Sequence, residues 1–182
     1  DLRINSPALY RLSYRGIDRD YSLIFKRCQI FSFKHYVLYI GWMKLKITTW
    51  DLAKDFVKPI RYEAFVKAQS IPEEEEWDHL DTVAWHAVLT VDGVAVGTGR
   101  LIINGAKARI GRMAIDASHR GRGFGKAILL KLIEVGKEKG VQEFILHAQV
   151  HAISFYAQSG FEPHGPIFDE VGIDHVEMRL EI

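Results

Sequence analysis

The chain lacks several residue patterns that would point to whole classes of protein. Its 182 residues contain one cysteine, Cys28, so no disulfide can form within the chain and no cysteine cluster can hold zinc. No apolar run approaches the roughly 20 residues of a membrane span. The best candidate, residues 28–42, is short and is interrupted by Lys34 and His35. The N-terminus also lacks the basic, apolar and small-residue order of a signal peptide. We therefore predict a cytoplasmic protein without a membrane partner.

A large excess of charge of either sign is missing as well. The chain has 24 Lys or Arg residues against 23 Asp or Glu residues, which gives a net charge of +1. A strong pull towards nucleic acid over the whole surface would need a clear basic excess. Apolar residues make up 48% and charged residues 26%, as is typical of a soluble globular protein. We therefore expect no nucleic acid partner, and the length fits one domain with an additional segment.

From Met43 onward, turn residues recur at regular intervals, and the segments between them are predicted to be strands and helices. Asp92-Gly93 and Asn104-Gly105 indicate two tight hairpin turns. We expect strands at Lys44–Thr49, Val83–Val91, Val94–Ile103, Lys107–Ile115, Glu143–Gln149, Phe161–Gly165 and His175–Ile182. We expect a first helix from Asp51 towards Gln69, with a kink or break at Pro59. A second helix should run from the glycine loop to Gly140, and a third over Ala152–Ser159. The second should bury a stripe formed by Ile128, Leu129, Leu132, Ile133 and Gly136. This order predicts a mixed α+β fold, in which a meander is followed by strand–helix crossovers.

The strongest local signal is the glycine-rich loop at residues 120–125, which lies between a predicted strand and a predicted helix. Unpaired N–H groups at a helix N-terminus bind anions, because they lie at the positive end of the helix dipole. The three glycines let the backbone approach a ligand closely, and the two arginines add charge suited to phosphate. The loop is therefore a candidate phosphate site, and a basic surface turn is the alternative.

Two well-known phosphate loops do not fit this stretch. A Walker loop needs Ser or Thr after its lysine, and here Lys126 is followed by Ala127. A dinucleotide-binding loop needs the spacing G-x-G-x-x-G, and here the spacing is G-x-G-x-G. The pattern that fits is Arg-x-x-Gly-x-Gly, formed by Arg120, Gly123 and Gly125.

Residues 120–125 resemble the pyrophosphate-binding loop of Gcn5-related N-acetyltransferases, the GNAT family. Downstream, Ala148-Gln149, Ala152, Phe155-Tyr156 and Gly160-Phe161 resemble the family's strand–helix–strand segment. Two further stretches are similar to the ElaA-like group, namely Arg61-x-x-x-Phe65-Val66-x-x-Gln69 followed by Ile71-Pro72-x-Glu74, and Phe168-x-x-x-Gly172-Ile173-x-His175-x-x-Met178. The resemblance covers residues 43–182. It implies an α+β GNAT acyl-CoA N-acyltransferase fold, with a mostly antiparallel central sheet, splayed parallel strands and flanking helices.

The resemblance implies that the chain uses acetyl-CoA and moves the acetyl group to a primary amine, on a small molecule or a peptide, by direct attack. The pantetheine arm would lie between Arg109–Ile115 and Phe144–Gln149. Backbone groups of Met113, Ala114 and Ile115 would bind that arm and polarise the thioester carbonyl. The phosphates would bind at Arg120, Gly121, Arg122, Gly123, Phe124, Gly125 and Lys126. Relatives are often homodimers, so a homodimer stays open.

The resemblance also suggests catalytic residues. Tyr156 matches the family's tyrosine acid, which assists departure of the thiolate, and a core aromatic beside Phe155 is the alternative. Many relatives place a glutamate base on the fourth strand, whereas this strand carries Gly111. A water chain, His147 or one of Glu73–Glu76 could substitute. His147 is a candidate because histidine is the usual general base near neutral pH, although a half-buried strand histidine without a catalytic task is the more common case.

The acceptor is not named by the sequence. Residues expected to line its pocket are Arg61, Glu75, Phe168 and His175. The acidic run at residues 73–78 could attract a cationic amine, but we favour a solvated, charged loop or helix start. No metal site is expected, because His147 and His151 do not share one helix. The missing strand glutamate keeps open a non-catalytic module that binds or senses acyl-CoA on the same fold.

Residues 1–42 differ from the rest of the chain. They contain seven Lys or Arg, three Asp and no Glu, and they are rich in aromatic side chains. Met43 is the first methionine and stands where the family resemblance begins. We expect this N-terminal extension, whose role is unknown, to be dispensable and non-native, with residues 43–182 as the working domain. The alternatives are an arm that covers the acetyl-CoA site or a dimer surface, and a nucleic-acid-binding segment.

Overall fold

The computed structural model describes residues 42–182. The predictions for the N-terminal extension therefore lie outside the described residues, except at Trp42. Among residues 42–182, none of the helices combines the length and the apolar character that crossing a bilayer requires.

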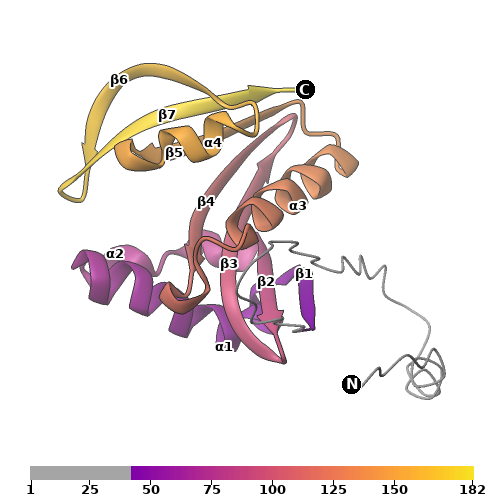
Figure 1. Cartoon of the computed structure of the whole chain (residues 1–182). Helices are drawn as coiled ribbons and strands as arrows, with labels where there is room; N and C mark the ends of the chain where they lie inside the picture. Colours follow the sequence, from indigo (N-terminus) through magenta and orange to yellow (C-terminus); the bar gives the residue numbers. More distant parts are fainter. Residues whose placement is uncertain (1–41) are drawn as a thin grey trace, which may run out of the picture.

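The described residues form one sheet with seven strands in the order β1-β2-β3-β4-β5-β7-β6 (Figure 1). The strands are β1 (Met43–Thr49), β2 (Trp85–Val91), β3 (Val94–Asn104), β4 (Lys107–Ile115), β5 (Glu143–Gln149), β6 (Glu162–Glu170) and β7 (Ile173–Glu181). Every neighbouring pair is antiparallel except β4 and β5, which are parallel. The predicted fold class is confirmed.

Helices of three kinds connect the strands. The α-helices are α1 (Trp50–Arg61), α2 (Glu73–Glu76), α3 (Phe124–Glu138) and α4 (Ile153–Ala157). A π-helix, η1 (Tyr62–Lys67), continues α1, and three short 3₁₀ turns are η2 (His79–Val83), η3 (Ala117–His119) and η4 (Val150–Ala152). In Figure 1, α1 and α2 lie at one end of the view, and α4 with β6 and β7 lies at the other.

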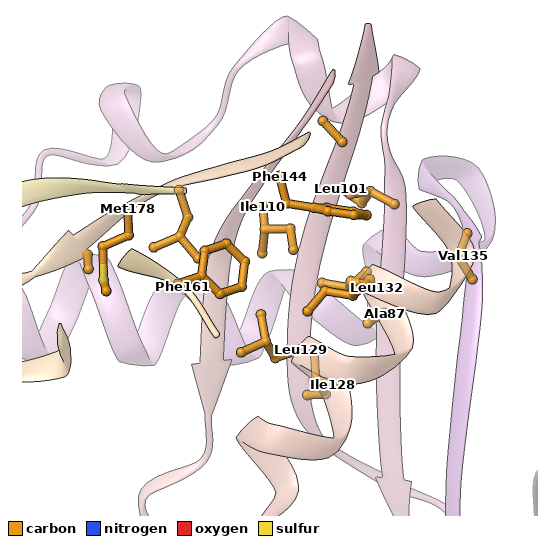
Figure 2. Packing of buried hydrophobic residues seen from close by; sticks show 14 of the residues in the cluster. Ala87, Leu101, Ile110, Ile128, Leu129, Leu132, Val135, Phe144, Phe161 and Met178 are labelled. Atoms are coloured by element: carbon orange, nitrogen blue, oxygen red, sulfur yellow. The ribbon is translucent and has the colours of Figure 1, made fainter. Parts of the chain in front are cut away.

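The two long helices cover opposite faces of the sheet, because side chains alternate along each strand. On β2, Val88 packs with Ala53 and Val57 of α1, whereas Ala87 and Leu89 belong to the larger cluster that includes α3. The α3 stripe predicted from the sequence is buried, as Figure 2 shows for Ile128, Leu129 and Leu132. A side chain at Gly136 would overlap the ring of Phe144, so glycine lets α3 pack closely on β5.

Several predicted boundaries were wrong. The first helix runs through Pro59, changes to π-helical hydrogen bonding at Tyr62 and stays helical to Gln69, so its predicted extent is confirmed but the predicted break at the proline was wrong. Val83 belongs to η2, the turn that holds the acidic residue Asp81 in the interior, and its own side chain is exposed. The strand therefore begins later than predicted, at Trp85. The sixth strand continues past Gly165 to Glu170, with an irregular register between His164 and Phe168. The last short helix splits into η4 and α4, which ends at Ala157.

Candidate active site

The parallel strands β4 and β5 separate along their length. They pair only through Lys107 with Glu143, Ala108 with Phe144 and Arg109 with Ile145, although β4 continues to Ile115 and β5 to Gln149. A cavity of about 950 Å³ opens where the pairing stops, and residues of both strands line it. Backbone groups on this edge of β4 are therefore available to a ligand instead of a neighbouring strand.

A β-bulge bends β4 beside this opening. Thr98 of β3 pairs with Ala114 and Arg100 pairs with Gly111, so Arg112 and Met113 together oppose one residue of β3. Arg112 has a φ of 51°, in the left-handed region that few non-glycine residues adopt. Bulges of this kind bend a strand and redirect its groups, and they are common next to active sites. This bulge overlaps, at Met113, the start of the segment predicted to bind the pantetheine arm.

The glycine loop lies at the end of the cavity that follows β4. Gly121 and Gly123 have φ values of 73° and 78°, and no atom lies within 4 Å of the position that a Cβ would take at either. The first N–H groups of α3, which begins at Phe124, have no carbonyl partner within the helix. Of the seven residues predicted at 120–126, all except Arg122 line the cavity. This open cradle of N–H groups fits the phosphates of a coenzyme.

Tyr156 of α4 lines the same cavity. Its ring packs edge-on against Phe155, with ring centroids 4.9 Å apart, and against Phe161 at 6.2 Å. Burial raises the pKa of Tyr156 to about 12. The hydroxyl therefore stays protonated throughout the physiological pH range and can act only as a proton donor there. Tyr156 thus combines the aromatic packing and the cavity position that the sequence left as alternatives.

A largely buried ion cluster lies at the other end of the cavity, where Glu76, Asp78, Arg100 and Arg112 line the wall, and the sequence did not predict it. Its members are three arginines and three carboxylates, namely Arg61, Arg100, Arg112, Glu76, Asp78 and Asp81. Arg61 donates to Glu76 and, at 2.8 Å, to Asp81. Arg100 donates to Asp81 at 2.8 Å and to Asp78 at 2.7 Å. The opposite charges balance, and the cluster joins α1, α2, η2, β3 and the bulge of β4.

Burial and charge both act on the pKa values of this ion cluster. Burial raises the pKa of Glu76, and the charges of Arg61 and Arg112 oppose that rise. At Asp78, burial also acts to raise the pKa, but the hydrogen bond from Arg100 and the charges of Arg100 and Arg112 outweigh it, so the pKa is lowered. Burial lowers the pKa of His86, whose Nε2 lies 2.8 Å from the carbonyl oxygen of Asp81. A neutral imidazole donating to that carbonyl fits this environment.

The acidic run at residues 73–78 was predicted to be solvated, and this prediction was wrong at two positions. Glu76 is 1% exposed and Asp78 is half-buried, so neither is a freely solvated charge. Glu74 and Glu75 remain exposed and line the cavity. No local pattern distinguishes Glu76 and Asp78 from Glu74 and Glu75, because their partners Arg61 and Arg100 lie 15 and 22 residues away on other elements.

His147 of β5 lines the cavity beside Glu170 of β6 and Arg109 of β4. Its Nδ1 lies 2.7 Å from Oε2 of Glu170 and 2.9 Å from Nη2 of Arg109. The ring of Phe168 packs edge-on against the imidazole at 4.8 Å. The imidazole thus has two polar neighbours on one nitrogen, and Glu170 was not among the predicted site residues.

The residues predicted to line the acceptor pocket have different positions. Glu75 and His175 line the cavity. Phe168 contacts two lining histidines, His147 at 4.8 Å and His175 at 6.2 Å between ring centroids. Arg61 does not line the cavity. It is 0% exposed and all its described hydrogen bonds go to Glu76 and Asp81, so it acts below the pocket.

A pair of amide side chains connects the two walls of the cavity. Gln69, after the π-helix, and Gln149, at the end of β5, exchange two hydrogen bonds of 3.0 and 3.4 Å. Both residues line the cavity. The separation of eighty residues between them explains why the sequence gave no sign of the contact.

Comparisons with known proteins agree on one family. The family model for the acetyltransferase (GNAT) domain matches residues 54–182. The uncharacterized protein YyaT of Bacillus subtilis (strain 168) is 35% identical over 143 residues, which make up 77% of this chain and 97% of the relative. The uncharacterized N-acetyltransferase YjcF of the same organism is 34% identical over 123 residues, 67% of this chain and 88% of the relative.

Solved structures share the fold. The crystal structure of Escherichia coli ElaA matches with a TM-score of 0.70 at 21% identity, over 76% of this chain and 99% of that chain. A GNAT family acetyltransferase from Elizabethkingia anophelis, solved with acetyl-CoA bound, matches with a TM-score of 0.60 at 16% identity, over 77% of this chain and 98% of that chain. At these identities the likeness concerns the fold alone.

Proposed function

Because the chain belongs to the GNAT acetyltransferase family, we propose that it transfers an acetyl group from acetyl-CoA to a primary amine by direct attack. The observation that carries the proposal is the separation of β4 from β5 after three residue pairs, next to an open glycine cradle at the N-terminus of α3. A neighbour of the same fold was solved with acetyl-CoA bound, which supports the choice of donor.

Acetyl-CoA, when bound, supplies the acetyl group as a thioester. Backbone N–H groups of the glycine loop and the first turn of α3 would hold the phosphates, because they lie at the positive end of the helix dipole. Lys126 would add a charge beside them, since it also lines the cavity. The free edge of β4, from Met113 to Ile115, would bind the arm and polarise the carbonyl through fixed backbone donors.

Tyr156 would donate a proton to the departing sulfur. Its position on the cavity supports this role, because it keeps a protonated hydroxyl next to the cleft. The acceptor amine would enter from the opposite end, between α2, the π-helix and the β6–β7 hairpin. The exposed carboxylates Glu74 and Glu75 line that entrance and favour a cationic amine.

The test is release of free thiol from acetyl-CoA in the presence of candidate amines, namely polyamines, amino acids, aminoglycosides and peptides. We expect at least one class to raise thiol release above the rate in buffer, with the acetylated amine detected by mass spectrometry. Binding of acetyl-CoA without any amine-dependent release would instead favour a non-catalytic module that binds or senses acyl-CoA.

Tyr156→Phe tests the acid role, because it keeps the ring and removes only the hydroxyl. Turnover should fall on the order of a hundredfold, the usual contribution of a positioned acid. Acetyl-CoA binding, measured as a thermal shift, should barely change. Phe155→Leu serves as the matched control, since it disturbs the same aromatic packing but leaves the hydroxyl in place. Normal turnover in Tyr156→Phe would show that this tyrosine is structural.

A further inference from the structure

The reaction needs a proton acceptor for the amine, and β4 carries no carboxylate where one would reach the cleft. Gly111 lines the cavity, and no atom lies within 4 Å of the position of an added Cβ there. The parallel ladder pairs Lys107 with Glu143 and Arg109 with Ile145 before it stops. Continuing that register sets Gly111 opposite His147. Both residues line the cavity, so the imidazole and the open space beside Gly111 belong to the same cleft.

We propose that Glu170 is a positioning residue, which holds His147 with Nδ1 protonated and Nε2 free to accept a proton from the acceptor amine. This inference rests on the proposed acetyl transfer. The juxtaposition that carries it is His147 Nδ1 at 2.7 Å from a Glu170 carboxylate oxygen, with the imidazole on the wall of the cavity.

The two polar neighbours of Nδ1 have opposite effects on the imidazole. Glu170 can only accept, so its contact requires a proton on Nδ1 and leaves the lone pair on Nε2. Arg109 can only donate, so its contact at 2.9 Å requires a lone pair on Nδ1 and places the proton on Nε2. Only the tautomer with its proton on Nδ1 can act as a base at Nε2. Glu170 therefore selects the active tautomer, and Arg109 competes with it.

Other charged groups lie near the pair formed by His147 and Glu170. Arg109 also lies 3.9 Å from Glu170, so it neutralises part of the carboxylate charge. On β7, Glu177 is the cross-strand partner of His147, and it is occupied by Arg179 at 2.7 Å. His164 of β6 and His175 of β7 face the same surface of the sheet, and among them His175 acts on Glu170 through its charge. Within the described residues, Glu170 is the carboxylate that bonds the imidazole.

The step conserves atoms and charge. The nitrogen of the neutral amine forms a bond to the acyl carbon, and the carbon–sulfur bond breaks with its electron pair on sulfur. The proton on nitrogen moves to Nε2 of His147, while the sulfur takes the proton of the Tyr156 hydroxyl. Solvent then returns a proton from His147 to Tyr156.

The experiment compares Glu170→Met, which removes charge and acceptor, with Glu170→Gln, which keeps an acceptor of the same length. Amine-dependent kcat should fall by about tenfold or more in Glu170→Met, because the general base it orients contributes at least that much. The fall should be smaller in Glu170→Gln, and KM for acetyl-CoA should be unchanged in both. Equal and small losses in the two variants would overturn the proposal, since they would indicate a purely structural residue.

Arg109 supplies a test of opposite sign. Arg109→Met removes the competing donor, so the double variant Arg109→Met with Glu170→Met should regain part of the rate that Glu170→Met loses. A double variant that is slower than Glu170→Met alone would contradict the competition between tautomers.

Nitrogen NMR of the imidazole tests the same idea without turnover. The His147 ring, assigned by loss of its signal in His147→Gln, should carry its proton on Nδ1 in the wild type and on Nε2 in Glu170→Met. An Nε2-protonated ring in the wild type would overturn the proposal. If the wild type has the expected tautomer but releases no thiol with any amine, then the proposed acetyl transfer fails while the pairing of Glu170 with His147 stands.

Discussion

The two ends of the cavity are built by different means. The proposed cofactor end consists of backbone, namely the glycine loop, the first turn of α3 and the free edge of β4. The acceptor end consists of side chains from distant segments, which include the buried ion cluster, the Gln69–Gln149 pair and the His147–Glu170 pair. A backbone site tolerates many side chains but few changes of conformation. A side-chain site depends instead on every partner being present, because an unpaired buried charge is costly.

The largest effect is expected at the backbone end. Gly123→Val should abolish the rise in melting temperature that acetyl-CoA gives the wild type, because its side chain would occupy the cradle. Gly140→Val is the matched control, since Gly140 has a similar φ of 83°, open space around it and a place at the other end of α3. Both variants carry the same backbone strain. A retained acetyl-CoA shift in Gly123→Val would show that this loop is not the cofactor site.

The next effect concerns the ion cluster. Arg61→Met should lower the free energy of unfolding by about 3–5 kcal/mol, because it leaves Glu76 and Asp81 buried with fewer partners. The control Lys67→Met breaks the exposed pair with Glu63 and should cost less than about 1 kcal/mol. Urea unfolding measures both. The acetyl-CoA shift should persist in folded Arg61→Met, and its loss would contradict the independence of the two ends.

A pH dependence follows from Asp78, whose pKa is lowered because the hydrogen bond and charges of the arginines outweigh burial. A carboxyl whose folded pKa lies below its unfolded value stabilises the fold above the unfolded value, 3.8, and loses that contribution as pH falls through the folded pKa. Asp78→Asn should therefore be less stable than the wild type at pH 7, and the difference should shrink below pH 3.8. Urea unfolding across pH measures it, and a difference that grows on acidification would refute this assignment.

The smallest effect is expected where the two walls meet. Gln69→Met and Gln149→Met should each lower the free energy of unfolding by about 1 kcal/mol, since each breaks the same two hydrogen bonds. The double variant should cost little more than either single change, because the partners act together. Fully additive losses in this cycle would mean that the pair contributes nothing as a pair.

The contrast between the two ends also explains what could be predicted from the sequence. The loop at 120–125 before a helix could be predicted, because contiguous spacing and glycine determine local backbone conformation. The seven strands were predicted for the same reason, since hairpin turns and alternation are local. Tyr156 was singled out by the family resemblance, and the structure places it on the cavity. Glu170, Asp78 and Gln69 could not be assigned, because their partners lie 23, 22 and 80 residues away. Arg61 was predicted to line the pocket, because nothing in the sequence indicated that its side chain is buried.

The short ladder between β4 and β5 has a mechanical consequence. Strand β5 holds β4 through three residue pairs, but it holds β7 through seven, and β7 in turn holds β6. A change in the width of the cleft would therefore be expected to move β5, β7 and β6 together relative to β4, from the paired end near Lys107 and Glu143. His147 and Glu170 lie on β5 and β6, whereas Glu75 and the bulge at Arg112 lie on the other side of the cleft. The width of the proposed acceptor end would thus change together with the distance between β4 and β5, the two strands between which the pantetheine arm is proposed to lie.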